Sequence, residues 1–223
     1  MTEKFTPLFS DPGFTKLFLH ELRSWIGRTF RRRRSRIHCT QSPLLLDLGA
    51  GANYTKGWIH VDYYRLKFWQ KCPPKPDVET DLRFPIHCED NTADGVYSGH
   101  MIEHLYPDEA WRLLQEIYRI LKPSCWLRIN FPDLETYVDY YVNGEKYPEV
   151  KYSSGCDAIS NVTQNYGHHS AWDERQMTKA LSTIGFIHIK KVEFGKEGTD
   201  KRLIKEENAR KWATLVIEAQ KPE

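Results

Sequence analysis

The segment from Leu44 to Gly51, which reads Leu-Leu-Leu-Asp-Leu-Gly-Ala-Gly, limits the fold of this chain more than any other. Its apolar run has the length of a buried strand. Gly49 and Gly51 permit a tight turn and let a ligand come close to the backbone. In an open α/β sheet, ligands bind at the carboxyl ends of the strands. An ordinary strand-to-loop turn can also contain such a glycine pair, so further residues must support a site here.

The rest of the chain alternates between strand-like and helix-like segments. Strands are predicted over residues 44–48, 58–62, 78–81, 95–98, 126–131, 186–194 and 212–219, and helices over residues 14–30, 107–121 and 170–184. Residues 133–170 are rich in Tyr, Asn, Gly and Ser and are interpreted as an irregular insertion. Strands and helices that alternate and end in a strand pair indicate a three-layer α/β domain.

Charge divides the chain into two parts, an N-terminal helix with a basic arm (residues 1–42) and a single domain (residues 43–223). Residues 1–40 hold 9 Lys or Arg against 3 Asp or Glu, although the net charge of the whole chain is only +2. We find no signal peptide and no apolar stretch of the roughly 18–20 residues that span a membrane. The 5 cysteines show no CxxC spacing, which is typical of reduced thiols, and we expect a cytoplasmic protein.

Polar residues stand at the ends of four predicted strands. Asp47 ends the first strand, and Asp62 ends the second, where a carboxylate can accept hydrogen bonds from both hydroxyls of a ribose. Asp81, at the end of the third strand, can accept from an adenine amino group. The fourth strand ends in Ser98-Gly99-His100, beside the glycine turn. Together these strand ends indicate a site for a nucleoside cofactor.

The series resembles the class I S-adenosylmethionine-dependent methyltransferases. Within them it is most similar to the methyltransferase type 11 group, in its bacterial branch of predicted SAM-dependent methyltransferases. The motifs that carry the resemblance extend over about residues 44–221 and include Gly57-Trp-Ile-His-Val-Asp62, Asp81-Leu-x-x-Pro85, His100-x-x-Glu-His-Leu105, Arg119-x-Leu-Lys-Pro123 and Phe131-Pro-Asp133. The resemblance implies a Rossmann-like sheet of seven mostly parallel strands with an antiparallel last strand. It also implies the transferase activity and the cofactor S-adenosyl-L-methionine, with S-adenosyl-L-homocysteine as product.

The resemblance assigns cofactor-binding residues one by one. It implies that the methionine part lies among Asp47, Gly49, Ala50 and Gly51, the ribose beside Asp62 and Tyr63, the adenine beside Asp81 and Leu82, and the sulfonium near Ser98, Gly99 and His100. Acidic residues suit this cofactor because its ammonium and hydroxyl groups are hydrogen-bond donors.

The acceptor is expected to lie under the region from residue 133 to residue 172, which follows the fifth strand. Aromatic and imidazole side chains there suit a pocket with apolar walls and a few polar groups. The predicted pocket residues are Asp133, Tyr137, His168, His169 and Trp172. The resemblance implies a small-molecule acceptor, in particular the hydroxyl of a sugar or of a cell-surface glycan precursor. His100 is the first candidate for the general base and His169 the second, although His100 could instead only fix the loop beneath the cofactor.

Other functions remain as alternatives. His100-Met-Ile-Glu-His104 matches the H-x-x-E-H pattern of some zinc peptidases. A strand before it and Pro107 after it predict a loop rather than the helix that such a site needs, so we expect no metal. Gly49 and Gly51 lack the third glycine of a dinucleotide fingerprint. The remaining alternatives are a non-catalytic module that binds the cofactor or a partner, and a nucleic-acid or protein methyltransferase, although nucleic acid is the less favoured partner.

The short segment after the glycine turn bears on the expected position of the N-terminal helix. Only six residues separate Gly51 from Trp58, and an ordinary crossover helix does not fit there because a complete crossover takes roughly 10–12 residues. A first helix of a turn or two at most is expected, around Asn53 to Lys56. We therefore expect the helix over residues 14–30 to cover the sheet instead. Its apolar face and the run Arg31–Arg34 could also give residues 14–36 a weak contact with a membrane surface, but packing on the sheet is favoured.

Overall fold

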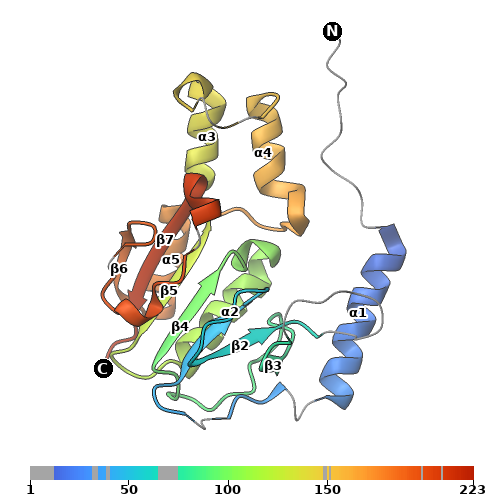
Figure 1. Cartoon of the computed structure of the whole chain (residues 1–223), viewed down its shortest axis with the longest axis vertical. Helices are drawn as coiled ribbons and strands as arrows, with labels where there is room; N and C mark the ends of the chain where they lie inside the picture. Colours follow the sequence, from blue (N-terminus) through green and yellow to red (C-terminus); the bar gives the residue numbers. More distant parts are fainter. Residues whose placement is uncertain are drawn as a thin grey trace.

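The computed structural model describes residues 13–31, 35–38, 41–64, 75–147, 150, 152–196, 198–206 and 208–223. Seven strands form one sheet in the order β3-β2-β1-β4-β5-β7-β6 (Figure 1). Their bounds are β1 Leu45–Leu48, β2 Trp58–Asp62, β3 Val78–Glu79, β4 Gly95–Gly99, β5 Trp126–Pro132, β6 Ile187–Val192 and β7 Thr214–Gln220. Strands β1 to β5 pair in parallel, and β7 runs antiparallel to both of its neighbours. The predicted fold class and the order of the elements are confirmed.

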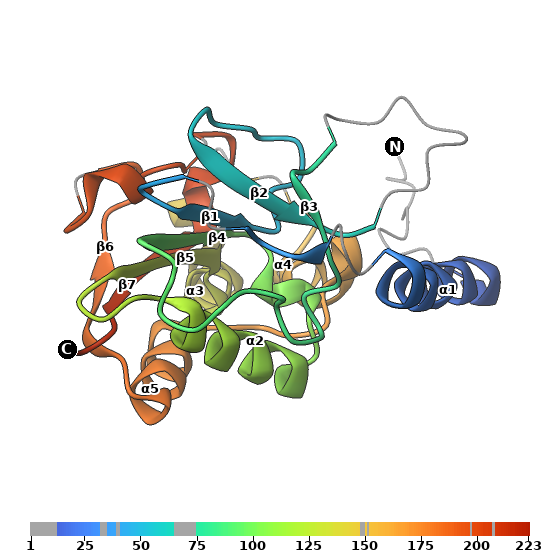
Figure 2. The ribbon, with the colours of Figure 1, turned by 90° about the horizontal axis from the view of Figure 1, so that it is seen from below.

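Two amphipathic helices, α2 (Pro107–Ile120) and α5 (Glu174–Ile184), cover one face of the sheet (Figure 2). Strand residues alternate between the two faces of a sheet, and Leu46 and Leu48 of β1 point to the side of these helices. The main hydrophobic core lies in this layer, where Leu46, Leu48, Ile117 and Leu181 are fully buried. The helices therefore hold the strands from one side and leave the other face to a different segment.

The second face is covered by the chain from residue 198 to residue 206. Leu203, in a short 3-10 turn, is fully buried and packs with Leu45, Trp58 and Tyr97. Between β1 and β2 the chain forms turns and no helix, so the short helix expected around Asn53 to Lys56 is not formed, although the absence of an ordinary crossover helix agrees with the short spacing. The expectation that residues 14–30 cover this face is wrong, because a segment from the C-terminal part of the chain already fills it.

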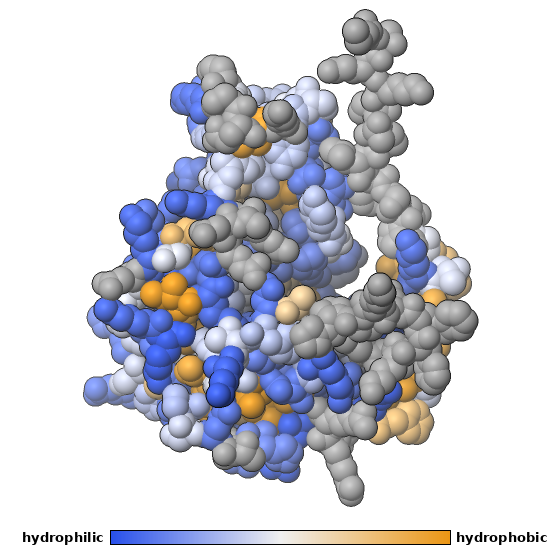
Figure 3. Space-filling model, in the orientation of Figure 1, coloured by the Kyte–Doolittle hydropathy of each residue, from blue (hydrophilic) through white to orange (hydrophobic). Residues whose placement is uncertain are grey.

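Helix α1 (Gly13–Phe30) lies at the β3 edge of the sheet and turns its small and polar residues toward the domain (Figures 1 and 2). Ser24 and Gly27 are its buried residues, and Ser24 Oγ donates a hydrogen bond of 2.5 Å to Asp81. A Cβ on Gly27 would lie 2.4 Å from the ring of Tyr64, so only glycine permits this approach. The apolar residues face outward, in part visible in Figure 3, and comprise Phe14, Leu17, Phe18, Leu19, Trp25 and Phe30.

The structure describes only some of the residues on which the predictions about the basic arm, the cysteines and membrane spanning depend. Residues 1–12 and Arg32, Arg33 and Arg34 of the basic arm lie outside the described part of the chain. Cys125 and Cys156 are free thiols, Cys88 Sγ lies 3.1 Å from the hydroxyl of Thr92, and Cys39 and Cys72 lie outside the described residues. No helix in the described ranges has the length and apolarity needed to cross a bilayer.

The insertion after β5 is helical, which corrects the prediction of irregular structure. Helices α3 (Leu134–Asn143) and α4 (Gly155–Gln164) pack on each other beyond the carboxyl ends of β4 and β5 (Figure 1). Both helices have side-chain N-caps: the Asp133 carboxylate accepts from the backbone NH of Glu135, and Ser154 Oγ accepts from that of Asp157. Such caps satisfy backbone donors that a first helical turn leaves free.

Helix α5 begins later than the predicted residue 170. Its N-cap is Asp173, which accepts a hydrogen bond of 2.7 Å from the backbone NH of Gln176. Ser170 is not the cap, because its hydroxyl instead accepts from Trp172 Nε1 and donates to a backbone carbonyl. The predicted end is confirmed: Gly185 has a φ of +116°, a conformation that favours glycine.

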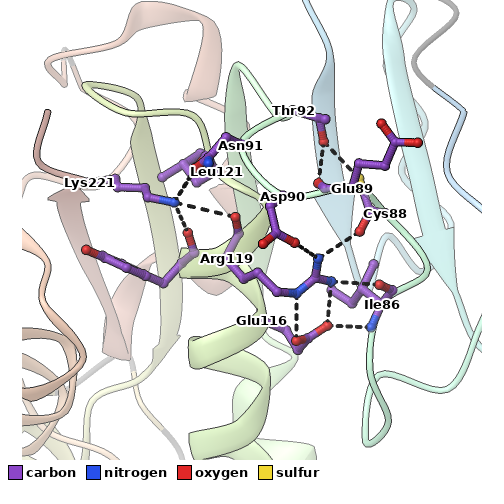
Figure 4. Close-up of polar contacts among 11 residues, drawn as sticks. Ile86, Cys88, Glu89, Asp90, Asn91, Thr92, Glu116, Arg119, Leu121 and Lys221 are labelled. Carbon is purple, nitrogen blue, oxygen red and sulfur yellow. Dashed lines mark hydrogen bonds and ion pairs between the residues drawn. The ribbon is translucent and has the colours of Figure 1, made fainter.

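The Arg119 motif has a structural role, which Figure 4 shows. The guanidinium donates to the backbone carbonyls of Ile86 and Cys88 at 2.8 Å each and pairs with Glu116. Glu116 in turn accepts from the backbone NH of Ile86 at 2.7 Å. Lys221, just beyond β7, donates to carbonyls at the end of α2, including that of Leu121. This motif therefore ties the chain before β4 and the end of the domain to α2.

Candidate functional site

A cavity of about 280 Å³ lies at the carboxyl ends of β1 and β4, and we call it the strand-end cavity. Its lining residues are Asp47, Gly49, Ala50, Gly51, Ala52, Asn53, Tyr97, Gly99, His100, His104, Asn130, Phe194 and Lys205. Six of the predicted cofactor residues are therefore brought together here, namely Asp47, Gly49, Ala50, Gly51, Gly99 and His100. The parallel pairing of β1 with β4 explains this, because their carboxyl ends lie at the same edge of the sheet.

The glycine turn forms one wall of the strand-end cavity. Gly49 has a φ of +80°, and a Cβ there would lie 2.4 Å from the side chain of Met101. The backbone NH of Gly51 donates a 3.0 Å hydrogen bond to Asp62 Oδ2. Asp62 does not line the cavity itself, but this bond places its carboxylate directly against the turn. The other Asp62 oxygen accepts from the backbone NH of Tyr63 at 2.6 Å.

A buried ion pair crosses the cavity from β1 to the segment that covers the second face. The carboxylate of Asp47, 3% exposed, pairs with the ammonium of Lys205. Burial raises the pKa of Asp47, and the charge of Lys205 opposes this shift. The Lys205 ammonium also lies 4.5 Å from the ring centroid of Trp58 and 5.6 Å from that of Tyr97. Sequence analysis missed Lys205 because it lies 158 residues from Asp47 with no motif around it.

Asn130 and Tyr97 line the cavity from neighbouring strands, β5 and β4. Asn130 Nδ2 donates to the Tyr97 hydroxyl at 2.8 Å, and burial raises the pKa of that hydroxyl. Asn130 Oδ1 is buried, and no donor among the described residues reaches it. A hydrogen-bond acceptor without a partner is therefore available at the wall of the cavity.

The predicted adenine residues lie outside this cavity. The Asp81 carboxylate accepts from Ser24 of α1 and from the guanidinium of Arg83, whose Nη2 lies 2.7 Å away. Burial alone would raise the pKa of Asp81, but these hydrogen bonds outweigh it and hold that pKa below its ordinary value. Leu82, 5% exposed, belongs to the hydrophobic core.

Two further predicted residues do not line the cavity. Tyr63 stacks on His20 of α1, with ring centroids 4.4 Å apart, and its hydroxyl donates to the His20 carbonyl. Ser98 is buried in β4, and its hydroxyl donates to the backbone carbonyl of Leu48 at 3.1 Å. Ser98 therefore links β4 to β1 beneath the site.

A second cavity, of about 390 Å³, lies between the sheet and the α3–α4 insertion, and we call it the tyrosine cavity. It is lined by His100, Pro132, Tyr137, Tyr152, Asn161, Tyr166, His168, Trp212, Ala213 and Thr214. Tyr137 and His168 were predicted here. His100 was predicted as the first candidate for the general base. Sequence analysis did not assign the remaining lining residues to the acceptor pocket, and of these Trp212 packs edge-on against Tyr137 with ring centroids 5.0 Å apart. A short 3-10 helix before β7 brings Trp212 to the insertion.

Three predicted acceptor residues lie elsewhere. Asp133 is the N-cap of α3, His169 is exposed and stacks on Tyr106 at 4.4 Å, and Trp172 is 4% exposed in the core. None of them lines either cavity. The side chain of His169 therefore gives no support to its predicted catalytic role.

His100 lines both cavities and joins them. Its φ is +50°, and its backbone NH donates to the carbonyl of Asn130 at 2.9 Å. Nδ1 lies 3.2 Å from Glu103 Oε1, and Nε2 lies 3.0 Å from the hydroxyl of Thr214. The residues after His100 form a single 3-10 turn, Ile102–His104, and α2 starts only at Pro107, which agrees with the predicted loop.

Comparison with known proteins agrees with the fold. Residues 46–129 match the family model of the type 11 methyltransferase domain. A SAM-dependent methyltransferase, possible histamine N-methyltransferase, from Thermotoga maritima has a similar structure, with a TM-score of 0.50, 17% identity, and coverage of 93% of this chain and 94% of that one. Phosphoethanolamine N-methyltransferase 2 of Haemonchus contortus, in complex with S-adenosyl-L-methionine, gives a TM-score of 0.51 and 15% identity over 94% of this chain and 57% of that one. No curated protein sequence matches the chain.

Proposed function

We propose that this chain, whose residues 46–129 match a methyltransferase domain, is a class I S-adenosylmethionine-dependent methyltransferase that methylates a small-molecule acceptor in the cytoplasm. We assign the cofactor to the strand-end cavity and the acceptor to the tyrosine cavity. The observation that carries this assignment is that His100, predicted to lie near the sulfonium, lines both cavities. Methyl transfer needs the acceptor atom and the sulfonium methyl group in line, and such alignment is feasible where two cavities meet.

The amino-acid end of the cofactor suits the Asp47–Lys205 pair. This end carries an ammonium and a carboxylate, and the cavity offers a carboxylate beside an ammonium. Asn130 Oδ1 adds a buried acceptor without a partner among the described residues. We propose that Asp47 and Asn130 accept from the cofactor ammonium and that Lys205 pairs with its carboxylate.

The nucleoside end of the cofactor is proposed to extend from the glycine turn toward β3. Asp62, which contacts Gly51, would accept from the ribose hydroxyls. We retain Asp81 and Leu82 as the proposed adenine contacts. Because Ser24 and Arg83 already donate to the Asp81 carboxylate, an adenine amino group would have to replace one of these donors.

For the acceptor we propose a hydroxyl group of a small polar molecule such as a sugar or a glycan precursor. The aromatic walls made by Tyr137, Tyr152 and Trp212 suit the apolar faces of a sugar ring, and Asn161 offers polar atoms to its hydroxyls. The acceptor oxygen would form a bond to the methyl carbon while the carbon–sulfur bond breaks and its electron pair stays on sulfur. The proton of the hydroxyl would pass to Nε2 of His100, which would exchange its hydrogen bond with Thr214 for one with the acceptor, while Glu103 orients the ring through Nδ1.

Calorimetric titration with S-adenosyl-L-methionine and S-adenosyl-L-homocysteine tests the cofactor site. Asp62→Ala removes the ribose acceptor, and Gly49→Val fills the turn where a Cβ already meets Met101. Each variant should weaken binding at least about tenfold, which corresponds to roughly 1.4 kcal/mol. Gly144→Ala serves as the control, because its Cβ would meet only one atom, at 4.0 Å. Unchanged affinity in both folded site variants would contradict the assignment.

We also propose that α1 makes a weak contact with an anionic membrane surface. Six of its eight large apolar side chains are 46–82% exposed, and the first 40 residues carry an excess of basic residues. Apolar residues on one face of a basic helix are typical of interfacial binding.

Sedimentation with vesicles of neutral and anionic lipid tests this contact. The chain should bind the anionic vesicles, less strongly as salt increases, and Phe18→Ser with Trp25→Ser should reduce binding at least about tenfold, the loss of roughly 1.4 kcal/mol. Val142→Ser changes an equally exposed apolar residue of α3 and should have little effect. Absence of binding, or salt-dependent binding to RNA alone, would refute the proposal.

A further inference from the structure

Three side chains at the junction of the two cavities form a cluster with the composition of a metal site. One ligand atom from each of Glu103, His104 and His168 lies within 4.8 Å of the other two. Glu103 and His104 belong to the turn after β4, and His168 follows α4 in the insertion. The cluster therefore forms only when the insertion folds onto the sheet.

Hydrogen bonds orient both histidines. His104 Nδ1 lies 3.3 Å from the carbonyl oxygen of Gly167, and His168 Nδ1 lies 2.8 Å from that of Val162. A carbonyl can only accept, so each Nδ1 carries the proton and each Nε2 keeps its lone pair. Histidines that ligate metals characteristically donate their other ring NH to a carbonyl or carboxylate in this way.

A buried carboxylate oxygen of Glu103 is a second indication, separate from the clustering, that a cation binds here. Glu103 is 2% exposed, and its Oε1 is 3.2 Å from His100 Nδ1. Its Oε2 is buried and has no hydrogen-bond partner among the described residues. A buried carboxylate oxygen without a donor is costly, and a cation held by the two neighbouring imidazoles would remove that cost.

We propose that Glu103, His104 and His168 bind a divalent first-row transition metal, with Zn²⁺ as the first choice. Two imidazoles and one carboxylate form the ligand set of many catalytic zinc sites, which keep a further position open. Because His104 lines the strand-end cavity and His168 the tyrosine cavity, the metal would lie where acceptor and cofactor meet. It would act there as a Lewis acid on an acceptor oxygen, a role that rests on the proposed function.

This proposal replaces the sequence prediction of no metal. It also differs from the peptidase reading of the H-x-x-E-H pattern. His100, the first residue of that pattern, has both ring nitrogens occupied by Glu103 and Thr214. The third ligand is instead His168, which the pattern does not contain.

Metal binding is measured on the full chain, freed of tags and treated with chelator. Titration with Zn²⁺, followed by calorimetry and by elemental analysis after dialysis, should give one ion per chain. Mg²⁺ prefers all-oxygen sites and should bind at least about a hundredfold more weakly. Glu103→Gln and His168→Gln should each weaken Zn²⁺ binding at least about tenfold, or roughly 1.4 kcal/mol.

His169→Gln is the matched control, because this neighbouring histidine is exposed and stacks on Tyr106 outside the cluster. It should bind Zn²⁺ as the unchanged chain does. Less than one ion per chain, or equal losses in His168→Gln and His169→Gln, would overturn the proposal. If Glu103→Gln does not fold, His168→Gln and His104→Gln decide. Titration of the same variants with S-adenosyl-L-homocysteine separates the two ideas, since a failed cofactor site would appear there without any change in Zn²⁺ binding.

Discussion

Among the residues of the proposed cofactor site, Lys205 is the one whose substitution should lower stability most directly. Its ammonium is the charge partner of Asp47, and the two side chains are 7% and 4% exposed. Removal of one partner of a buried ion pair leaves the other charge unpaired and typically costs about 3–5 kcal/mol. Lys205→Met should therefore lower the free energy of unfolding by an amount of that order, measured by urea denaturation.

The double variant Asp47→Asn with Lys205→Met isolates this effect. It removes both charges, so it should recover much of the stability that Lys205→Met loses. A single variant as stable as the original chain, or a double variant that is less stable than the single one, would show that the pair is not a coupled buried interaction.

At the level of residues, the sequence predicts the part of the site that lies close to glycine and strand-end motifs. Asp47, Gly49, Gly51 and His100 line the strand-end cavity as predicted. Lys205 was not predictable, because its place follows from how a distant segment crosses the second face. His169 was chosen over the pocket residues because sequence shows which residues are near a site but not which way a side chain points.

At the level of elements, the docking of α1 depends on the ionised Asp81 carboxylate. The hydrogen bonds from Arg83 and Ser24 outweigh the effect of burial and hold the pKa of Asp81 below its ordinary value of 3.8. A carboxyl group with a lowered pKa stabilises the fold above the unfolded-state pKa and loses this contribution as the pH falls through the folded-state pKa. Asp81→Asn should therefore cost about 1.5–3 kcal/mol at pH 7.

The pH dependence of the stability lost in Asp81→Asn distinguishes an electrostatic cause from a change in packing. The stability difference between Asp81→Asn and the original chain should narrow as the pH is lowered below 3.8, as measured by urea midpoints at pH 7 and at acid pH. Asp108→Asn, which removes an exposed partner of Arg112, should change stability little at either pH. A difference for Asp81→Asn that stays constant down to acid pH would refute the electrostatic explanation.

Elements with a strong hydrophobic periodicity were predictable from the sequence. Helices whose starts are marked mainly by capping residues were less predictable. Strand β2 has the bounds that the sequence predicts, and α2 differs from its predicted range by one residue. The insertion was misread because its tyrosines and glycines suggested loops, while the capping residues Asp133 and Ser154 were not recognised. Local hydrogen bonds to the first turn there outweigh an unfavourable composition.

For the molecule as a whole, a sheet of seven mostly parallel strands with an antiparallel last strand was predictable from the family resemblance, but the second layer was not. The segment that covers the second face is held by charges as well as by Leu203. Arg128 of β5 is fully buried and pairs with Glu206 and with Glu218 of β7, the latter at 2.7 Å. A Cβ at Gly198 would lie 1.8 Å from the Glu218 carboxylate. The two ion pairs of Arg128 join residues 78 and 90 positions apart, beyond the reach of any local pattern.

Helix α1 turns small and polar residues toward the domain and most of its apolar residues outward, and this orientation has a thermodynamic consequence. The heat capacity change of an unfolding step scales with the apolar area that it exposes. Ser24 and Gly27 are the buried residues of α1, and six of its eight large apolar side chains already face outward, so release of the helix would uncover mainly Leu22, Ile26 and the ring of Tyr64. Its detachment would therefore carry only a small part of the heat capacity change, and the calorimetric transition of this protein would report mainly the seven-stranded domain. Amide hydrogen exchange, which responds to local opening, would register α1 as a separate unit.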